Sequence, residues 1–154
     1  MWSAGRRSAT GRCPLPPELL SGEAASIRPE RVELETPPGP ASTIARLVLG
    51  GIAERLRLGF EELDDVQLAL ERLLAEAGSE QRVHVSFEWT EQILHAYVGP
   101  LREAPIAAAL EGPEGARGEL GLRRILETVV DSFAIEQVDG DGPVVRLDKL
   151  VRRS

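Results

Sequence analysis

The chain has a single cysteine, Cys13, among its 154 residues. One thiol excludes an intramolecular disulfide, and it also excludes a zinc or iron–sulfur cluster held by several cysteines. No run of about 18 apolar residues is present, which is the length that a membrane-spanning helix needs. Arg6 and Arg7 are not followed by an apolar segment, so the sequence predicts no secretory signal and we expect a cytoplasmic protein.

The sequence also has fewer positively than negatively charged residues. The 18 Lys and Arg residues face 25 Asp and Glu residues, for a net charge of −7 and a pI near 5.0. A non-specific nucleic-acid binder or a protein held on an anionic membrane needs the opposite balance, so we expect neither partner. An acidic surface is typical of a protein that meets other proteins. The 42% hydrophobic content is enough for one two-layer core.

Common catalytic signatures are absent as well. The sequence shows no phosphate-binding P-loop, no Ser/His/Asp order of a hydrolase and no pair of catalytic carboxylates. His84 and His95 fall on the same face of two adjacent predicted strands, where diagonal neighbours with Glu88 suggest a metal site. The preferred interpretation is two surface histidines, because zinc would find too few ligands there.

The N-terminal residues 1–29 are rich in Ser, Gly, Pro and Arg and show no hydrophobic periodicity. We interpret them as a disordered extension, or as the product of a start codon assigned too early. The folded domain is then expected over residues 30–154. Its first element is a strand at 31–35 with Val32 and Leu34 directed inward, because apolar and charged residues alternate there.

Two helices are predicted next. Prolines at 37, 38 and 40 precede the first helix, over about 41–58. Its expected buried face consists of Ile44, Leu47, Val48, Ile52 and Leu56. The second helix, over 60–78, carries the strongest apolar stripe in the chain, made of Leu63, Val66, Leu70, Leu73, Leu74 and Ala77. Gly50 and Gly51 weaken the first helix, and we interpret them as a place of close packing on a neighbour.

The rest of the chain predicts a hairpin of strands at 82–89 and 93–98, followed by a long connection over 99–118 with a short helix at 106–110. A helix at 120–131 and a second hairpin, 133–138 and 144–150, complete the domain. The expected fold class is α+β, a two-layer sandwich of a mixed, mainly antiparallel sheet with helices on one face. The predicted core comprises Leu34, Ile44, Val48, Leu70, Leu73, Val85, Phe87, Ala96, Ile125, Val129 and Leu147.

This element order and three segments resemble a known family. The segments are IAERLRLGFEELDDVQLALE at 52–71, GELGLRRILETVVD at 118–131 and VVRLDKL at 144–150. Residues 31–150 thereby resemble the anti-sigma-factor serine kinases of the histidine-kinase-type ATPase superfamily. The resemblance implies a histidine-kinase-like fold. It also implies an ATP site that would involve Arg72, Glu76, Gly118, Gly121 and Leu122.

Several positions of that site differ from the family pattern. The family's second helix carries a glutamate base and, four residues later, an asparagine that holds magnesium; here these are Arg72 and Glu76. Arginine cannot accept a proton, whereas Glu76 offers an oxygen to a cation. The preferred interpretation of the two residues is an exposed ion pair one helical turn apart.

The adenine and phosphate positions also depart from the pattern. Pro100 stands where the family has the aspartate that accepts the adenine amino group, and its side chain offers no acceptor. Glu119 replaces a phosphate-binding glycine, and Pro143 or Val144 replaces a supporting threonine. We therefore predict a degenerate ATP site with no cofactor.

Two functions follow from the resemblance. The preferred one is a regulatory protein-binding domain of the anti-sigma type that acts by partner switching in transcription control. It implies a sigma factor or an anti-sigma antagonist as partner, and a homodimer. The acidic residues at 61, 62, 64 and 65 would suit a basic partner surface. The alternative is an active serine/threonine protein kinase that binds ATP and magnesium through Glu76; a structural partner subunit is a third option.

Overall fold

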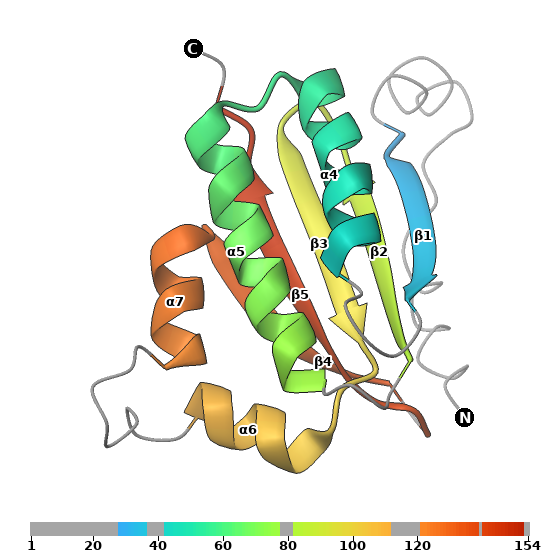
Figure 1. Cartoon of the computed structure of the whole chain (residues 1–154), viewed down its shortest axis with the longest axis vertical. Helices are drawn as coiled ribbons and strands as arrows, with labels where there is room; N and C mark the ends of the chain where they lie inside the picture. The colour runs from blue at the N-terminus through green and yellow to red at the C-terminus, as the bar shows by residue number, and fades with distance from the viewer. Residues whose placement is uncertain (1–27, 37–41, 78–81, 112–120, 139, 153–154) are drawn as a thin grey trace, which may run out of the picture.

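The computed structural model describes residues 28–36, 42–77, 82–111, 121–138 and 140–152. In chain order the elements are β1 (Glu30–Thr36), α4 (Ser42–Leu56), α5 (Phe60–Ala77), β2 (Val83–Trp89), β3 (Ile93–Gly99), α6 (Glu103–Glu111), α7 (Leu122–Val129), β4 (Ser132–Val138) and β5 (Gly142–Leu150). The helices cover one face of a single sheet (Figure 1), which confirms the α+β class and the two layers. The predicted extension at 1–29 lies outside the described residues except for its last two positions.

The five strands are ordered β1-β2-β3-β5-β4. Every pairing between them is antiparallel, so the expectation of a mixed sheet is wrong for the described part of the chain. The chain leaves β3 through α6 and α7, forms β4 at the sheet edge, and returns as β5 between β3 and β4. This return places the end of β3 beside the start of β5.

The strand register divides the sheet into two chemically different faces. Phe87, Ala96 and Leu147 stand side by side on β2, β3 and β5 and are buried under the helices. One position along each strand the side chains point the other way, as His95 and Asp148 do on the open face. The helix-covered face is apolar, and the open face is largely polar.

The core is organised around α5, as its apolar stripe predicts. Val66, Ala69, Leu70, Leu73 and Ala77 are its buried residues. Of the predicted core, Leu70, Leu73, Val85, Phe87, Ala96, Val129 and Leu147 are buried, and Leu34, Val48 and Ile125 are partly buried. Only Ile44 falls outside the core.

The predicted face of α4 is correct only in part: Ile52 is buried and Val48 and Leu56 are partly buried, but Ile44 and Leu47 are not. Ile44 is 50% exposed and Leu47 is 73% exposed. The helix instead buries Ala45, Leu49, Ile52 and Ala53, which also recur at helical spacing. Two of these inner residues are alanines, whereas the larger apolar residues at 44 and 47 lie outward. The sequence of this helix carries two apolar stripes, and packing selects the one with smaller residues.

The glycines of α4 do not mark close packing. A Cβ added at Gly50 or Gly51 would meet no atom within 4 Å, so the interpretation of close approach at these positions is wrong. Two connecting elements also differ in length from expectation. α6 is longer than the predicted 106–110, and α7 is shorter than 120–131. None of the helices in the described segments is both long and apolar enough to span a membrane.

Candidate functional site

The resemblance places the nucleotide site at one end of the molecule, where the C-terminal half of α5, the end of β3, α6 and the start of α7 come together (Figure 1). We call this the nucleotide-site end. Arg72 is exposed on α5 and Glu76 is half-buried. Within the described chain no ion pair joins them, so the ion-pair interpretation is wrong. Glu71, one position before Arg72, instead pairs with Arg46 of α4 at 3.0 Å.

The glycine segment contributes two described residues to this end. Gly121 is the N-cap of α7, and its carbonyl oxygen accepts a hydrogen bond from Ile125 N at 3.1 Å. Leu122 is 4% exposed and belongs to the hydrophobic core, so its side chain does not line a site. Gly118 and Glu119 lie outside the described residues. Arg123 pairs with Glu127 at 2.8 Å along the same helix.

The positions assigned to adenine recognition do lie together. Leu101 N, directly after Pro100, donates a hydrogen bond to the Pro143 carbonyl oxygen at 2.8 Å. A Cβ added at Gly99 would lie 2.8 Å from Val144 Cγ2, so the two chain segments touch here. The structure therefore brings Pro100, Pro143 and Val144 to one place, but their side chains carry no carboxylate or hydroxyl. None of these three side chains can accept a hydrogen bond from an adenine amino group.

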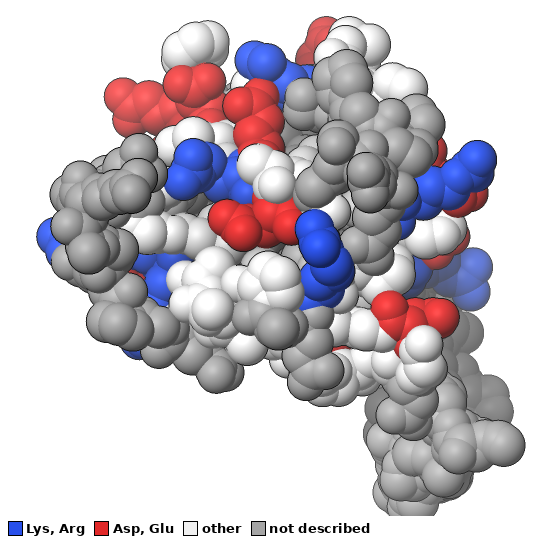
Figure 2. Space-filling model, turned by 60° about the horizontal axis from the view of Figure 1, so that its bottom comes forward, with Lys and Arg blue, Asp and Glu red and all other residues white. Residues whose placement is uncertain are grey.

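Apolar side chains pack the interior of the same end. Leu101, Ile106 and Leu110 are 3%, 2% and 4% exposed, and they join Leu73 and Leu126 in one continuous hydrophobic cluster. Ile106 and Leu110 come from α6, so this helix fastens the connection after β3 to the core. Seen from this end, the coloured Lys/Arg and Asp/Glu side chains are intermixed without an extended patch of one sign (Figure 2). No concentration of positive charge in view would favour a triphosphate.

The open face of the sheet carries a polar cluster, the Asp148 cluster, that the sequence did not reveal. Asp148 Oδ1 lies 2.5 Å from His95 Nδ1, and Asp148 Oδ2 accepts a hydrogen bond from Ser132 Oγ at 2.7 Å. Arg146 approaches the same carboxylate at 3.2 Å and donates a hydrogen bond to Glu136 at 2.8 Å. The cluster thus joins β3, β4 and β5. Its members occupy alternate positions on adjacent strands, and only the register of those strands shows that they meet.

The electrostatics of the cluster favour a charged carboxylate. Burial alone would raise the pKa of Asp148, but the hydrogen bonds from Ser132 and His95 and the charge of Arg146 outweigh it and lower the pKa. Asp148 in turn raises the pKa of Arg146. Desolvation and the nearby Glu88 raise the pKa of Tyr97. At neutral pH, Asp148 is therefore an anion held by three donors.

The Asp148 cluster is not arranged to activate Ser132 as a nucleophile. In a hydrolytic triad the serine bonds to the histidine, whereas here Ser132 bonds to Asp148. The suggested two-histidine metal site is also wrong. His84 pairs with Gly99, while His95 pairs with Glu88, so the histidines are two side-chain rows apart, about 13 Å along the strand. Among the described residues no group of three or more His, Cys, Asp or Glu is arranged to hold a metal ion.

A third feature, the Phe60 surface, lies at the start of α5. Phe60 is 80% exposed beside a pocket of about 350 Å³. The pocket is lined by Gly59, Phe60, Glu61, Glu62, Asp65, Lys149 and Arg152. Lys149 is 8% exposed, and its Nζ contacts Asp65 Oδ2 at 3.1 Å and the Val129 carbonyl oxygen at 2.8 Å. Three residues of the predicted acidic run, Glu61, Glu62 and Asp65, therefore line the pocket beside the exposed Phe60 ring, and the buried Lys149 holds Asp65.

No protein-family model matches this sequence, and a search of the curated proteins likewise returns no match.

Proposed function

We propose that this chain is a regulatory protein-binding domain of the anti-sigma type whose nucleotide site has been lost. The observation that carries the proposal is the apolar packing of Leu101, Ile106 and Leu110 at the nucleotide-site end, beside a Pro100 that offers no adenine acceptor. A kinase needs a base and a bound nucleotide at this end. The described residues supply an exposed Arg72 in the position of the base.

The fold supports the first half of the proposal. Two helices, a hairpin, two helices and a second hairpin follow one another, and all helices lie on one face of the sheet (Figure 1). This arrangement is compatible with the histidine-kinase-like fold that the sequence resembles. Fold analogy alone does not imply activity, so the function has to be argued from surfaces.

The Phe60 surface is the contact that we propose for the partner. Large aromatic residues dominate the energy of protein interfaces, and an exposed phenylalanine at the start of a helix is accessible to a partner. Glu61 and Glu62, in the first turn of α5, line the same pocket, and their negative charge favours a basic partner surface and a fast, salt-dependent association. By resemblance the partner is a sigma factor or an anti-sigma antagonist, and the domain acts as a homodimer.

Binding of the purified chain to sigma factors of its own organism tests this proposal. We expect Phe60→Ala to weaken the complex at least about tenfold by calorimetry, since loss of an interface anchor costs about 1.4 kcal/mol or more. Leu68→Ala is the matched control, because Leu68 is 43% exposed on the same helix but does not line the Phe60 pocket. Equal effects of the two variants, or no complex with any sigma factor or antagonist, would contradict the proposal.

A further inference from the structure

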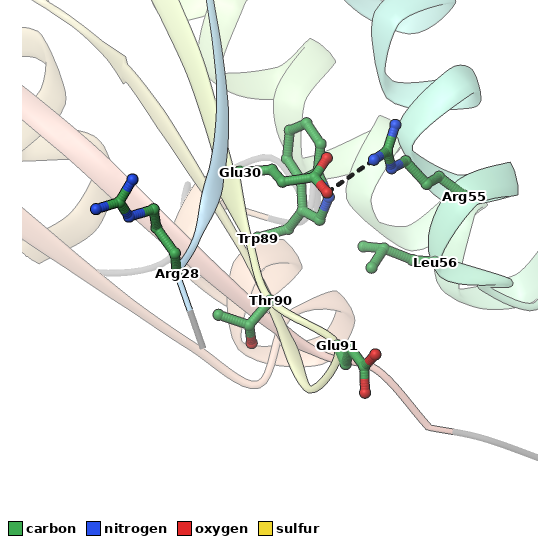
Figure 3. A pocket seen from close by; sticks show the side chains of 7 residues that line it. All are labelled: Arg28, Glu30, Arg55, Leu56, Trp89, Thr90 and Glu91. Atoms are coloured by element: carbon green, nitrogen blue, oxygen red, sulfur yellow. Dashed lines mark hydrogen bonds and ion pairs between the residues drawn. The ribbon is translucent and has the colours of Figure 1, made fainter. Parts of the chain in front are cut away.

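A second pocket lies at the opposite end of α4 from the nucleotide-site end, between the start of β1 and the turn that joins β2 and β3 (Figure 3). We call it the Trp89 pocket. Its volume is about 230 Å³, and its lining includes Arg28, Glu30, Arg55, Leu56, Trp89 and Thr90. Pockets for drug-sized molecules are about 300–1,000 Å³, so this pocket suits a smaller ligand.

The buried side chain in this pocket is a tryptophan. Trp89 is 7% exposed, and in the described part of the chain its indole N–H has no hydrogen-bond partner. A buried donor without a partner costs stability, so tryptophan N–H groups usually find an acceptor. In the view of Figure 3 the Trp89 side chain overlaps that of Glu30, which is joined to Arg55 by a hydrogen bond. A molecule that enters the pocket with a hydrogen-bond acceptor would satisfy this donor.

The charges in the lining are of both signs. Arg55 donates a hydrogen bond to Glu30 Oε1 at 2.8 Å, which leaves Glu30 Oε2 without a partner among the described residues. Arg28 adds a second guanidinium and Glu91 a second carboxylate at the rim. The last turn of α4, which supplies Arg55 and Leu56, adds the partial negative charge of a helix C-terminus. A ligand with a single charge would be attracted by one half of this lining and repelled by the other.

We propose that the Trp89 pocket binds a free α-amino acid with a small apolar side chain. Its carboxylate accepts the indole N–H of Trp89 and faces the arginines, and its ammonium faces Glu30 and the end of α4. Leu56 and the Trp89 ring provide the apolar wall for the side chain. This inference goes beyond the proposed function and does not depend on it, because the pocket shares no residue with the Phe60 surface.

The test is a titration of the ¹⁵N-labelled full chain followed by nuclear magnetic resonance. The chain has two tryptophans, so Trp2→Phe leaves the Trp89 indole as the only Nε1–H signal. L-Valine is the probe. Isovalerate, which lacks the ammonium, and L-valinamide, which lacks the carboxylate, are its matched analogues. We expect L-valine to shift the Trp89 signal downfield to saturation, with a Kd of about 1 mM or below, and each analogue to bind at least about tenfold more weakly.

Two variants assign the ammonium contact. Glu30→Gln should weaken L-valine at least about fivefold and should not weaken isovalerate, because only the ammonium needs that carboxylate. Glu33→Gln is the control, since Glu33 lies on the same strand but on the open face, where it pairs with Arg31. No saturable shift at about 20 mM L-valine, equal binding of isovalerate, or an equal loss in Glu33→Gln would overturn the proposal.

Discussion

Asp148 and Lys149 are adjacent residues of β5 that are both charged and both buried. They point to opposite faces of the sheet. Lys149 reaches under the helices to Asp65 of α5 and to the carbonyl oxygen of Val129 at the end of α7. Asp148 faces the open side and collects hydrogen bonds from Ser132 and His95. Each buried charge has partners, which is the condition for keeping it inside a fold.

The Asp148 cluster predicts a pH dependence of stability. The native contacts lower the pKa of Asp148 below its ordinary value of 3.8, so the native state favours the charged form. Their stabilisation is complete above the unfolded-state pKa and is lost as pH falls through the lower native pKa. The free energy of unfolding that Asp148→Asn removes should therefore shrink as the pH falls below about 4. Urea unfolding of both proteins between pH 7 and pH 2 measures this difference in unfolding free energy. A difference that grows as the pH falls would contradict the account.

Gly99 lies where the neighbouring chain segment leaves no room for a side chain. A Cβ there would lie 2.9 Å from both the Pro143 carbonyl oxygen and Val144 Cα, so backbone would have to move. Gly99→Ala should lower the free energy of unfolding by about 1–3 kcal/mol. Gly50→Ala is the control, since it meets open space within a helix and should raise stability by up to about 1 kcal/mol. Denaturation midpoints of the two variants that move in the same direction would refute this reading.

Among the elements, α5 and α4 show what a sequence pattern can and cannot decide. The apolar stripe of α5 predicts the bounds of the helix within one residue and most of its buried side chains, although Ala69 is buried without belonging to the predicted stripe and Leu63 and Leu74 are only partly buried. α4 has two such directions, and periodicity alone cannot choose between Ile44 with Leu47 and Ala45 with Leu49. The choice depends on how closely α4 approaches α5, which is a tertiary property. Likewise, the Asp148 cluster and the contact between the segments of Pro100 and Pro143 depend on the strand register, which we did not predict from the hydrophobic pattern.

The orientation of α4 is open to a direct test. Leu49 is fully buried, so Leu49→Ala should cost about 2–5 kcal/mol of unfolding free energy. Leu47 is 73% exposed, and Leu47→Ala should change stability by less than about 0.5 kcal/mol. The pair has identical chemistry and differs only in burial. If thermal or urea unfolding shows that Leu47→Ala destabilises the protein more than Leu49→Ala does, the buried face of α4 would be the one that contains Leu47.

At the scale of the whole molecule, the described residues form one apolar core and three separate surface features. The helices and the inner face of the sheet form one continuous core that extends through the nucleotide-site end. The Phe60 surface and the Trp89 pocket lie apart from that end, and the Asp148 cluster is on the open face of the sheet. This arrangement is compatible with the proposed protein-binding domain, which would contact its partners without a nucleotide.

The central claim, loss of the nucleotide site, is tested most directly by thermal unfolding of the full chain with ATP and magnesium. A ligand at 100 times its Kd would stabilise the native state by about 2.7 kcal/mol, a shift of several degrees. Because Pro100 offers no adenine acceptor and Leu101, Ile106 and Leu110 pack this end, we expect an unchanged midpoint at millimolar ATP. A clear rise in the midpoint that Glu76→Ala abolishes would contradict the account and establish the kinase alternative.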